Sequence, residues 1–358
     1  MASALEKDKY SNVIKINVVL CIITAILYFL YKEIGIIIIS ATVMLFVVML
    51  FSKGDMGNYV AKRILLAMLT IIIISAITFF TMNIIPGGPF DKEKALDPNV
   101  KATLEKRFNL DKPIGQQYLL YMNNLIHGDM GISLKNGRDI SDTIFGSFTI
   151  SAKIGGGAVL VALLLGLALG SIAALRSGKF ADRAIIFLTT LFVAVPSFIL
   201  ATLLMLVFCL QLKLVPVFTI DNPSYVLPII SLALYPMSYI TRLTKSSMLD
   251  VLGQDYIRTA KAKGVKDFYV IAKHALKNAL IPVITYIGPL TAYILTGSMV
   301  VETVFTIGGL GTKFVQGITN RDYTLIMGCT IFLSVLMVIM TLISDLIYKA
   351  VDPRISFK

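Results

Sequence analysis

Long apolar runs separated by shorter polar segments dominate the pattern of this chain. A helix needs about 20 apolar residues to cross a bilayer, and eight runs approach that length. In order, they are Val13–Tyr31, Ile34–Phe51, Ile64–Ile85, Ile154–Leu175, Ile185–Leu212, Val226–Leu243, Leu280–Val301 and Leu325–Tyr348. The pattern therefore predicts an all-α polytopic membrane protein.

Only Lys32 and Glu33 separate the first two runs, which predicts a tight N-terminal helical hairpin. A signal peptide is the alternative for the first run, but no small-residue cleavage site follows it and the second run begins at once. The run Val226–Leu243 contains Pro228 and Pro236. We expect a kinked span there, because neighbouring helices can satisfy the freed backbone groups.

Composition and charge agree with a membrane protein. The chain has 358 residues, 56% hydrophobic and only 15% charged, against about 25% charged in soluble domains. Nearly all of its net charge of +12 falls on one face, formed by the N-terminus, residues 52–63, 176–183 and 244–279, and the C-terminus. The positive-inside rule makes this face cytoplasmic. The charge is thus a topology signal, which places both termini in the cytoplasm and excludes nucleic acid as a partner.

Residues for catalysis or cofactor binding are absent from the sequence. There is no GxxxxGK[ST], HExxH or GxSxG motif, and the chain has two histidines. Cys21, Cys209 and Cys329 lie in separate apolar runs, where small buried hydrophobes are expected. Glu302 and Asp345 lie near span ends, where snorkelling or placement at a helix end explains them. We expect no enzyme activity, cofactor or metal in this chain.

The polar segment 86–153 is expected outside the membrane. The segments Asp97–Leu110 and Ile114–Ile126 each predict a short amphipathic helix, the second with Tyr118, Leu119 and Met122 on one face. A turn follows at residues 127–131. His127 and Asp129 suggest metal ligands, but two residues do not make a site and a turn-capping role is favoured.

The cytoplasmic segment 245–279 predicts two short helices hinged at Gly264. An apolar stripe follows the hinge at helical spacing, comprising Val265, Phe268, Tyr269, Ala272, Ala275, Leu276 and Ala279. Before the hinge, small residues are flanked by Arg258, Lys261 and Lys263. This surface fits the groove of an acidic partner protein or, equally, an anionic lipid surface.

Several spans carry glycines and hydroxyl side chains. Glycines at 155–157, 166 and 170 permit close helix contact. Hydroxyl groups that could line a polar path are those of Tyr235, Ser238, Tyr239, Tyr286, Thr291, Tyr293, Thr296 and Ser298. As candidates for the lining of a translocation path we select five of these residues and add one serine. The candidates are Ser197, Tyr235, Tyr239, Tyr286, Tyr293 and Thr296.

An ordered series of short motifs resembles a known family. The most specific are Tyr256-Ile257-Arg258-Thr259-Ala260-Lys261-Ala262-Lys263-Gly264 and His274-Ala275-Leu276-Lys277-Asn278-Ala279-Leu280-Ile281-Pro282. Others are Pro86-Gly87-Gly88-Pro89, Leu110-Asp111-Lys112-Pro113, Gly128-Asp129-Met130-Gly131, Val195-Pro196-Ser197-Phe198, Glu302-Thr303-Val304-Phe305, Gly308-Gly309-Leu310-Gly311 and Asp352-Pro353-Arg354. Together they resemble the B-type permease of the oligopeptide/dipeptide/nickel group of binding-protein-dependent ABC importers. The general importer motif begins Glu-Ala-Ala where this chain has Arg258-Thr259-Ala260, a change which that group shares.

The resemblance implies an ABC importer (type I) permease fold with six core transmembrane helices, plus the added hairpin. Its domains would be 1–57 and 58–358, with an extracytoplasmic segment 86–153 and a cytoplasmic coupling segment 245–279. Implied partners are a homologous C-type permease, two cytoplasmic ABC ATPases that bind ATP and Mg, an extracytoplasmic substrate-binding protein and the lipid bilayer. The implied ATPase-coupling residues are Arg258, Thr259, Ala260, Lys261, Ala262, Lys263 and Gly264.

The sequence leaves open the substrate and two alternative classes of protein. Oligopeptides are the first choice, then dipeptides, then nickel or a nickel chelate. A stand-alone secondary carrier would instead work without ATP or partners, and a membrane scaffold would carry no solute.

Overall fold

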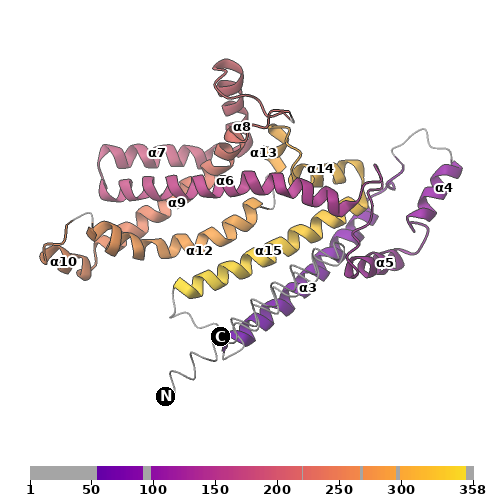
Figure 1. The fold of residues 1–358 in the computed structure, drawn as a ribbon, viewed down its shortest axis with the longest axis horizontal. Coiled ribbons are helices and arrows are strands. Elements are labelled where there is room, and N and C mark those ends of the chain that lie inside the picture. Colours follow the sequence, from indigo (N-terminus) through magenta and orange to yellow (C-terminus); the bar gives the residue numbers. More distant parts are fainter. Residues whose placement is uncertain (1–54, 92–97, 220, 267–268, 296–298, 352–358) are drawn as a thin grey trace. The chain divides into compact units, whose positions relative to one another are not determined.

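The computed structural model describes residues 55–91, 98–219, 221–266, 269–295 and 299–351. Every named element within these ranges is a helix, and the one bridge pairing joins Ile132 and Asp139 (Figure 1). The predicted all-α class is therefore confirmed. The predicted N-terminal hairpin and Cys21 lie outside the described residues. Cys209 and Cys329 are buried free thiols, as expected.

The described chain divides into two compact units. The first unit comprises residues up to Thr143 together with Asn320–Ile331. It holds α3 (Asp55–Ile84), α4 (Pro98–Arg107) and α5 (Ile114–Ile126), with the first turns of α6 (Ile140–Leu175) and α15 (Tyr323–Val351).

Helix α5 lies against α3 through Tyr118. Its hydroxyl group is 2.9 Å from Ser75 Oγ, its ring centroid is 5.4 Å from that of Phe79, and Met122 Sδ accepts a hydrogen bond from Ser75. The predicted bounds of α5 are confirmed, but Leu119 does not lie on the same face as Tyr118 and Met122, as had been predicted. Leu119 is 68% exposed, because it lies about 100° around the helix from Tyr118.

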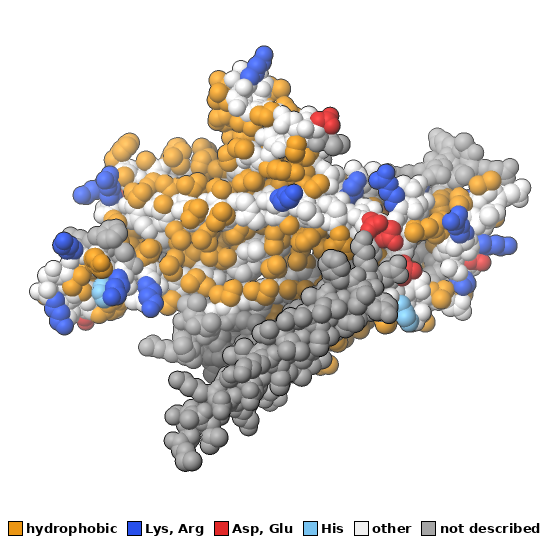
Figure 2. All heavy atoms as spheres, in the orientation of Figure 1, with side chains coloured by type: hydrophobic (Ala, Val, Ile, Leu, Met, Phe, Trp, Pro, Cys, Tyr) orange, Lys and Arg blue, Asp and Glu red, His pale blue; other side chains and the backbone are white. Residues whose placement is uncertain are grey.

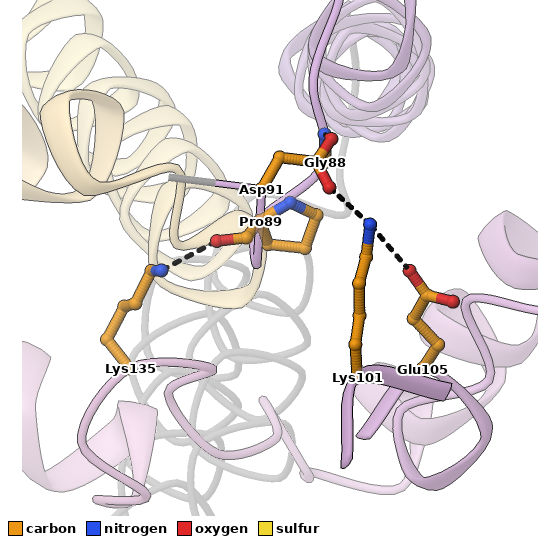
Figure 3. Close-up of polar contacts among 6 residues, drawn as sticks. All are labelled: Gly88, Pro89, Asp91, Lys101, Glu105 and Lys135. Atoms are coloured by element: carbon orange, nitrogen blue, oxygen red, sulfur yellow. Dashed lines mark hydrogen bonds and ion pairs between the residues drawn. The ribbon is translucent and has the colours of Figure 1, made fainter. Parts of the chain in front are cut away.

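Lysine side chains tether the loop that follows α3 (Figure 3). Lys101 Nζ of α4 lies 2.5 Å from Asp91 Oδ1 and 3.8 Å from Glu105 Oε1. Lys135 Nζ donates to the Pro89 carbonyl at 2.6 Å. The Lys101 ammonium and the Gly88 N–H both bond to Asp91, and they hold the pKa of its carboxyl below the usual value.

The second unit comprises Ile144–Thr319 and Phe332–Ile355. It holds most of α6 and α15, and between them α7 (Phe180–Ala194), α8 (Ser197–Leu204), the π-helix η1 (Met205–Gln211), α9 (Val226–Leu252), α10 (Asp255–Ala262), the π-helix η2 (Val270–Ala275), α12 (Leu276–Leu295), α13 (Met299–Val304) and α14 (Leu310–Asn320). In Figure 2 its helices carry mainly hydrophobic side chains along their flanks, and lysine and arginine gather at the end with α10 and the α6–α7 turn.

Helix α9 is central to the second unit, where it contacts α7, α8 and α12. Helix α6 crosses it closely at Gly166 and Gly170. A Cβ on Gly166 would lie 2.7 Å from Ile240 Cγ2, and one on Gly170 would lie 2.6 Å from the Thr241 carbonyl. These two glycines therefore permit the close helix contact that the sequence predicts.

Five described helices are long and apolar enough to cross a membrane, or six if a bent pair counts as one span. The bent pair joins Phe180–Ala194 to Ser197–Gln211 at an angle of 105°. The apolar run Ile185–Leu212, predicted as one span, is therefore interrupted by a sharp bend. Pro196 disfavours helical backbone at the preceding residue, and Val195 is extended with φ −85° and ψ 126°.

Candidate functional site

Four tyrosines form a line of phenol groups on α9 and α12, which we call the tyrosine stripe: Tyr235, Tyr239, Tyr286 and Tyr293. The rings of Tyr239 and Tyr286 join the two helices, with centroids 4.3 Å apart and planes at 31°. Tyr235 lies one turn before Tyr239 on α9, and Tyr293 lies two turns after Tyr286 on α12. The structure therefore brings these predicted path residues onto one surface.

In the stretch of α9 between Leu227 and Lys245, exposure is confined to this stripe. Between Leu227 and Lys245, Tyr235 and Tyr239 are 51% and 43% exposed, and the other side chains of α9 are buried or partly buried. Lipid-facing positions of a span normally carry aliphatic side chains, because an unpaired hydroxyl is costly in hydrocarbon. The exposed strip of this central helix has the chemistry of a surface that faces polar groups.

The other predicted path residues lie elsewhere. Ser197 is exposed at the first position of α8, directly after the bend at Pro196, and Thr296 lies outside the described residues. The hydroxyl groups of Ser238 and Thr291 donate to the carbonyls of Leu234 and Ile287 in their own helices, at 2.8 and 2.7 Å. Ser238 and Thr291 are thus satisfied locally.

A second surface surrounds Gly264. Helix α10 ends just before this glycine, whose φ of +74° lies in the left-handed region. Ile257 is buried in a cluster with Met248, Val270 and Ala275. Around this anchor Arg258 and Lys261 of α10, and Lys263 directly after it, are all exposed. The predicted break at Gly264 is confirmed.

The segment after the break differs from the prediction. It does not form a second short helix, because η2 runs directly into α12. The predicted apolar stripe is also partly wrong, since Tyr269 is 59% exposed while Val270, Ala275 and Ala279 are buried. A π-helix has more residues per turn than an α-helix, so η2 shifts the buried face away from the α-helical spacing. Phe268 lies outside the described residues.

The turn after α5 has the predicted structural role. Asp129 Oδ1 accepts the Gly131 N–H at 2.7 Å, and His127 Nδ1 lies 2.8 Å from the Asn123 carbonyl. Among the described residues, no group of three or more histidine, cysteine or acidic side chains is placed to hold a metal ion.

Glu302 is a polar centre whose environment the sequence did not indicate. Of the two sequence interpretations, snorkelling is wrong because the side chain is only 3% exposed, whereas Glu302 does lie near a helix end, two residues before α13 stops. The carboxylate accepts hydrogen bonds from Ser151 Oγ at 2.6 Å and from the Thr312 N–H at 2.9 Å. Any Cβ on Gly309 would collide with it. Glu302 thus joins α6, α13 and α14. The only sequence feature that pointed to this buried carboxylate was the glycine-rich segment 308–311, whose missing side chains leave room for it.

Family comparison decides what kind of protein carries these surfaces. The family described as "Binding-protein-dependent transport system inner membrane component" matches residues 166–357, and its N-terminal counterpart matches residues 56–153. The chain belongs to this family. The permease is therefore a membrane transport subunit, and residues 1–55 lie outside both matches.

Named relatives align with the permease over almost their whole length. It is 47% identical over 302 residues to "Dipeptide transport system permease protein DppB" of Bacillus subtilis (strain 168), covering 84% of this chain and 98% of that one. It is 39% identical over 306 residues to "Oligopeptide transport system permease protein OppB" of Salmonella typhimurium, covering 84% of this chain and all of that one. A solved structure of the MetNI methionine ABC transporter matches with a TM-score of 0.46 at 17% identity, over 58% of this chain and 95% of that one.

Proposed function

We propose that this permease forms one half of the translocation path of an ATP-driven peptide importer. The observation that carries the proposal is its alignment with a dipeptide and an oligopeptide permease over 98–100% of their lengths. The tyrosine stripe supports it, because an uncharged polar surface on the central span suits a polar solute. On this proposal Tyr235, Tyr239, Tyr286 and Tyr293 line the path, together with Ser197 and Thr296.

The proposed assembly supplies the energy from other chains. It contains a homologous C-type permease, two cytoplasmic ABC ATPases that hold ATP and Mg, and an extracytoplasmic substrate-binding protein. This chain itself binds no cofactor. The surface from Arg258 to Gly264 is the proposed contact with an ATPase, and its three exposed basic side chains favour an acidic groove.

The proposed topology follows the distribution of charge. Residues 1–57 form an N-terminal extension and residues 58–358 the permease domain. Both termini and the segment 245–279 lie in the cytoplasm, and the segment 86–153 lies outside the membrane, where the binding protein docks.

Reconstitution of the complete complex tests the proposal. Proteoliposomes that contain all subunits, with ATP on the ATPase side and binding protein on the other, should accumulate labelled di- and tetrapeptides only when ATP is present. Liposomes with this chain alone should take up neither peptide. Uptake by this chain alone without ATP would contradict the proposal and identify a secondary carrier.

A further inference from the structure

Prolines share the exposed face of α12 with the tyrosines. Pro282, Tyr286, Pro289 and Tyr293 are spaced by four, three and four residues, so they lie along one side of the helix. Pro282, Pro289 and Tyr293 are exposed and Tyr286 is partly exposed. We call this side of α12, together with Tyr235 and Tyr239 of α9, the proline–tyrosine surface.

Each internal proline frees one backbone acceptor. Proline has no N–H, so the carbonyl four residues earlier loses its helical donor. In α12 these carbonyls belong to Asn278 and Thr285, and each points along the helix towards the exposed proline that follows. The surface therefore offers phenol groups, which donate and accept, beside carbonyl oxygens, which only accept.

The helix stretches that carry this surface are uncharged, and the nearest charged residues along the chain, Arg242 and Lys277, lie directly beyond them. Residues 226–241 of α9 and residues 278–295 of α12 contain no acidic, basic or histidine side chain. A surface of this kind cannot select solutes by ion pairing or by metal ligation. Its phenol and carbonyl groups can instead form hydrogen bonds with polar groups of a solute.

We propose that the proline–tyrosine surface binds the main chain of the transported peptide. Peptides of different sequence share their backbone N–H and C=O groups and their two charged termini, and this uncharged surface suits the backbone groups. The freed carbonyls of Asn278 and Thr285 accept peptide N–H groups, and the hydroxyls of Tyr235, Tyr239 and Tyr286 donate to peptide carbonyls. This inference rests on the proposed function, and adds that recognition in the path is independent of peptide side chains.

Backbone N-methylation removes the N–H groups and therefore tests the proposal. The complete reconstituted importer is supplied with saturating binding protein loaded with a tetrapeptide or with the same tetrapeptide methylated at its internal amides. The wild-type complex should transport the methylated peptide more slowly.

Two variants test the surface itself. Pro289→Ala restores an N–H that pairs with the Thr285 carbonyl, and Tyr239→Phe removes one hydroxyl group. Each should slow the unmodified peptide about threefold to tenfold, the value of one or two hydrogen bonds, and Pro289→Ala should also reduce the discrimination against methylation.

Matched variants on α9 serve as controls. Pro228→Ala lies in the first helical turn, where the N–H has no helical acceptor, and Tyr225→Phe alters a ring that packs on Phe218 at 5.6 Å. Both should keep the wild-type rate and ratio for the two peptides.

Three outcomes would overturn the inference, and they differ from one another. If the wild-type complex accumulates no peptide, the proposed function falls with it. If peptide accumulates but Pro289→Ala and Tyr239→Phe keep the wild-type rate and ratio, only the main-chain proposal falls. If these variants lose the other subunits during purification, the surface is an interface with the companion permease.

Discussion

Glu302 shows how one buried carboxylate can hold several segments together. Replacement by alanine leaves Ser151 Oγ and the Thr312 N–H without their acceptor, and each such loss costs about 1–3 kcal/mol. We expect Glu302→Ala to lower the unfolding midpoint of the detergent-solubilised permease, and Glu302→Gln to lower it less because one amide oxygen still accepts. Thr303→Ala is the control, since that exposed hydroxyl bonds only to the Met299 carbonyl. Equal midpoints for Glu302→Ala and the control would contradict this role.

The ion pair of Asp91 with Lys101 predicts a local pH dependence. The Lys101 ammonium, followed by the Gly88 N–H, lowers the pKa of Asp91 from 3.8. A lowered folded-state pKa means that the tether of α4 is fully formed above pH 3.8 and is lost as the pH falls through the lowered value. Amide hydrogen exchange should show that protection of α4 decreases in this acidic range.

Two comparisons check that assignment. Asp91→Asn should show reduced α4 protection already at neutral pH and little further change on acidification. Asp111→Asn, at another exposed aspartate, should behave as the wild type. Because both partners of the ion pair are partly exposed, high salt should weaken the wild-type effect. An α4 protection that is independent of Asp91 would disprove the tether.

At the scale of elements, the close crossing of α6 and α9 depends on glycines, which have no side chain. A methyl group at Gly170 would lie 2.6 Å from the Thr241 carbonyl, so the helices must separate to accept it. We expect Gly170→Ala to destabilise the permease by about 1–3 kcal/mol, as overpacking does in other cores. Gly156 lies on the same helix with nothing within 4 Å of a Cβ. Gly156→Ala should therefore be neutral or slightly stabilising in the same denaturation assay, and a loss equal to that of Gly170→Ala would refute the packing explanation.

Elements whose local pattern agrees with their packing could be predicted from sequence. The bounds Ile114–Ile126 of α5 match, because Pro113 starts the helix and a turn with Gly128 ends it. The pair Tyr235 and Tyr239 could also be predicted as one face, because four residues make about one turn. Their contact with Tyr286 could not, since it depends on how α9 packs against α12.

The sequence predictions that differ from the structure lie mainly where the backbone departs from an ideal α-helix. Pro196 turns one apolar run into a pair of helices bent by 105°, and hydropathy does not report that angle. The π-helix η2 shifts the buried face, which is why Tyr269 is exposed and Val270 is buried. Glu302 was missed for a different reason, because Ser151, one of its partners, lies 151 residues away in the chain.

At the scale of the whole molecule, the central α9 relates the two candidate surfaces. It presents Tyr235 and Tyr239 from one part of its length, and near its end Met248 packs with Ile257 of α10. Movement of α10 in the proposed ATPase groove would therefore act directly on the helix that carries half of the tyrosine stripe. Alternating access needs such a mechanical connection between the site of ATP hydrolysis and the path.

Gly264 provides the sharpest test of that connection, because Gly178 is a matched control. Both glycines have φ near +75° and nothing within 4 Å of a Cβ, so alanine imposes similar backbone strain, about 1–2 kcal/mol, at either site. Gly178 lies in the α6–α7 turn, whereas Gly264 follows the basic surface of α10. In the reconstituted complex, we expect Gly264→Ala and more strongly Gly264→Leu to reduce peptide-stimulated ATP hydrolysis, and Gly178→Ala to leave it near the wild-type rate. Gly264→Asn should restore part of the coupling, because asparagine tolerates the left-handed region better than leucine. Normal stimulated hydrolysis in Gly264→Leu would rule out this segment as the coupling element.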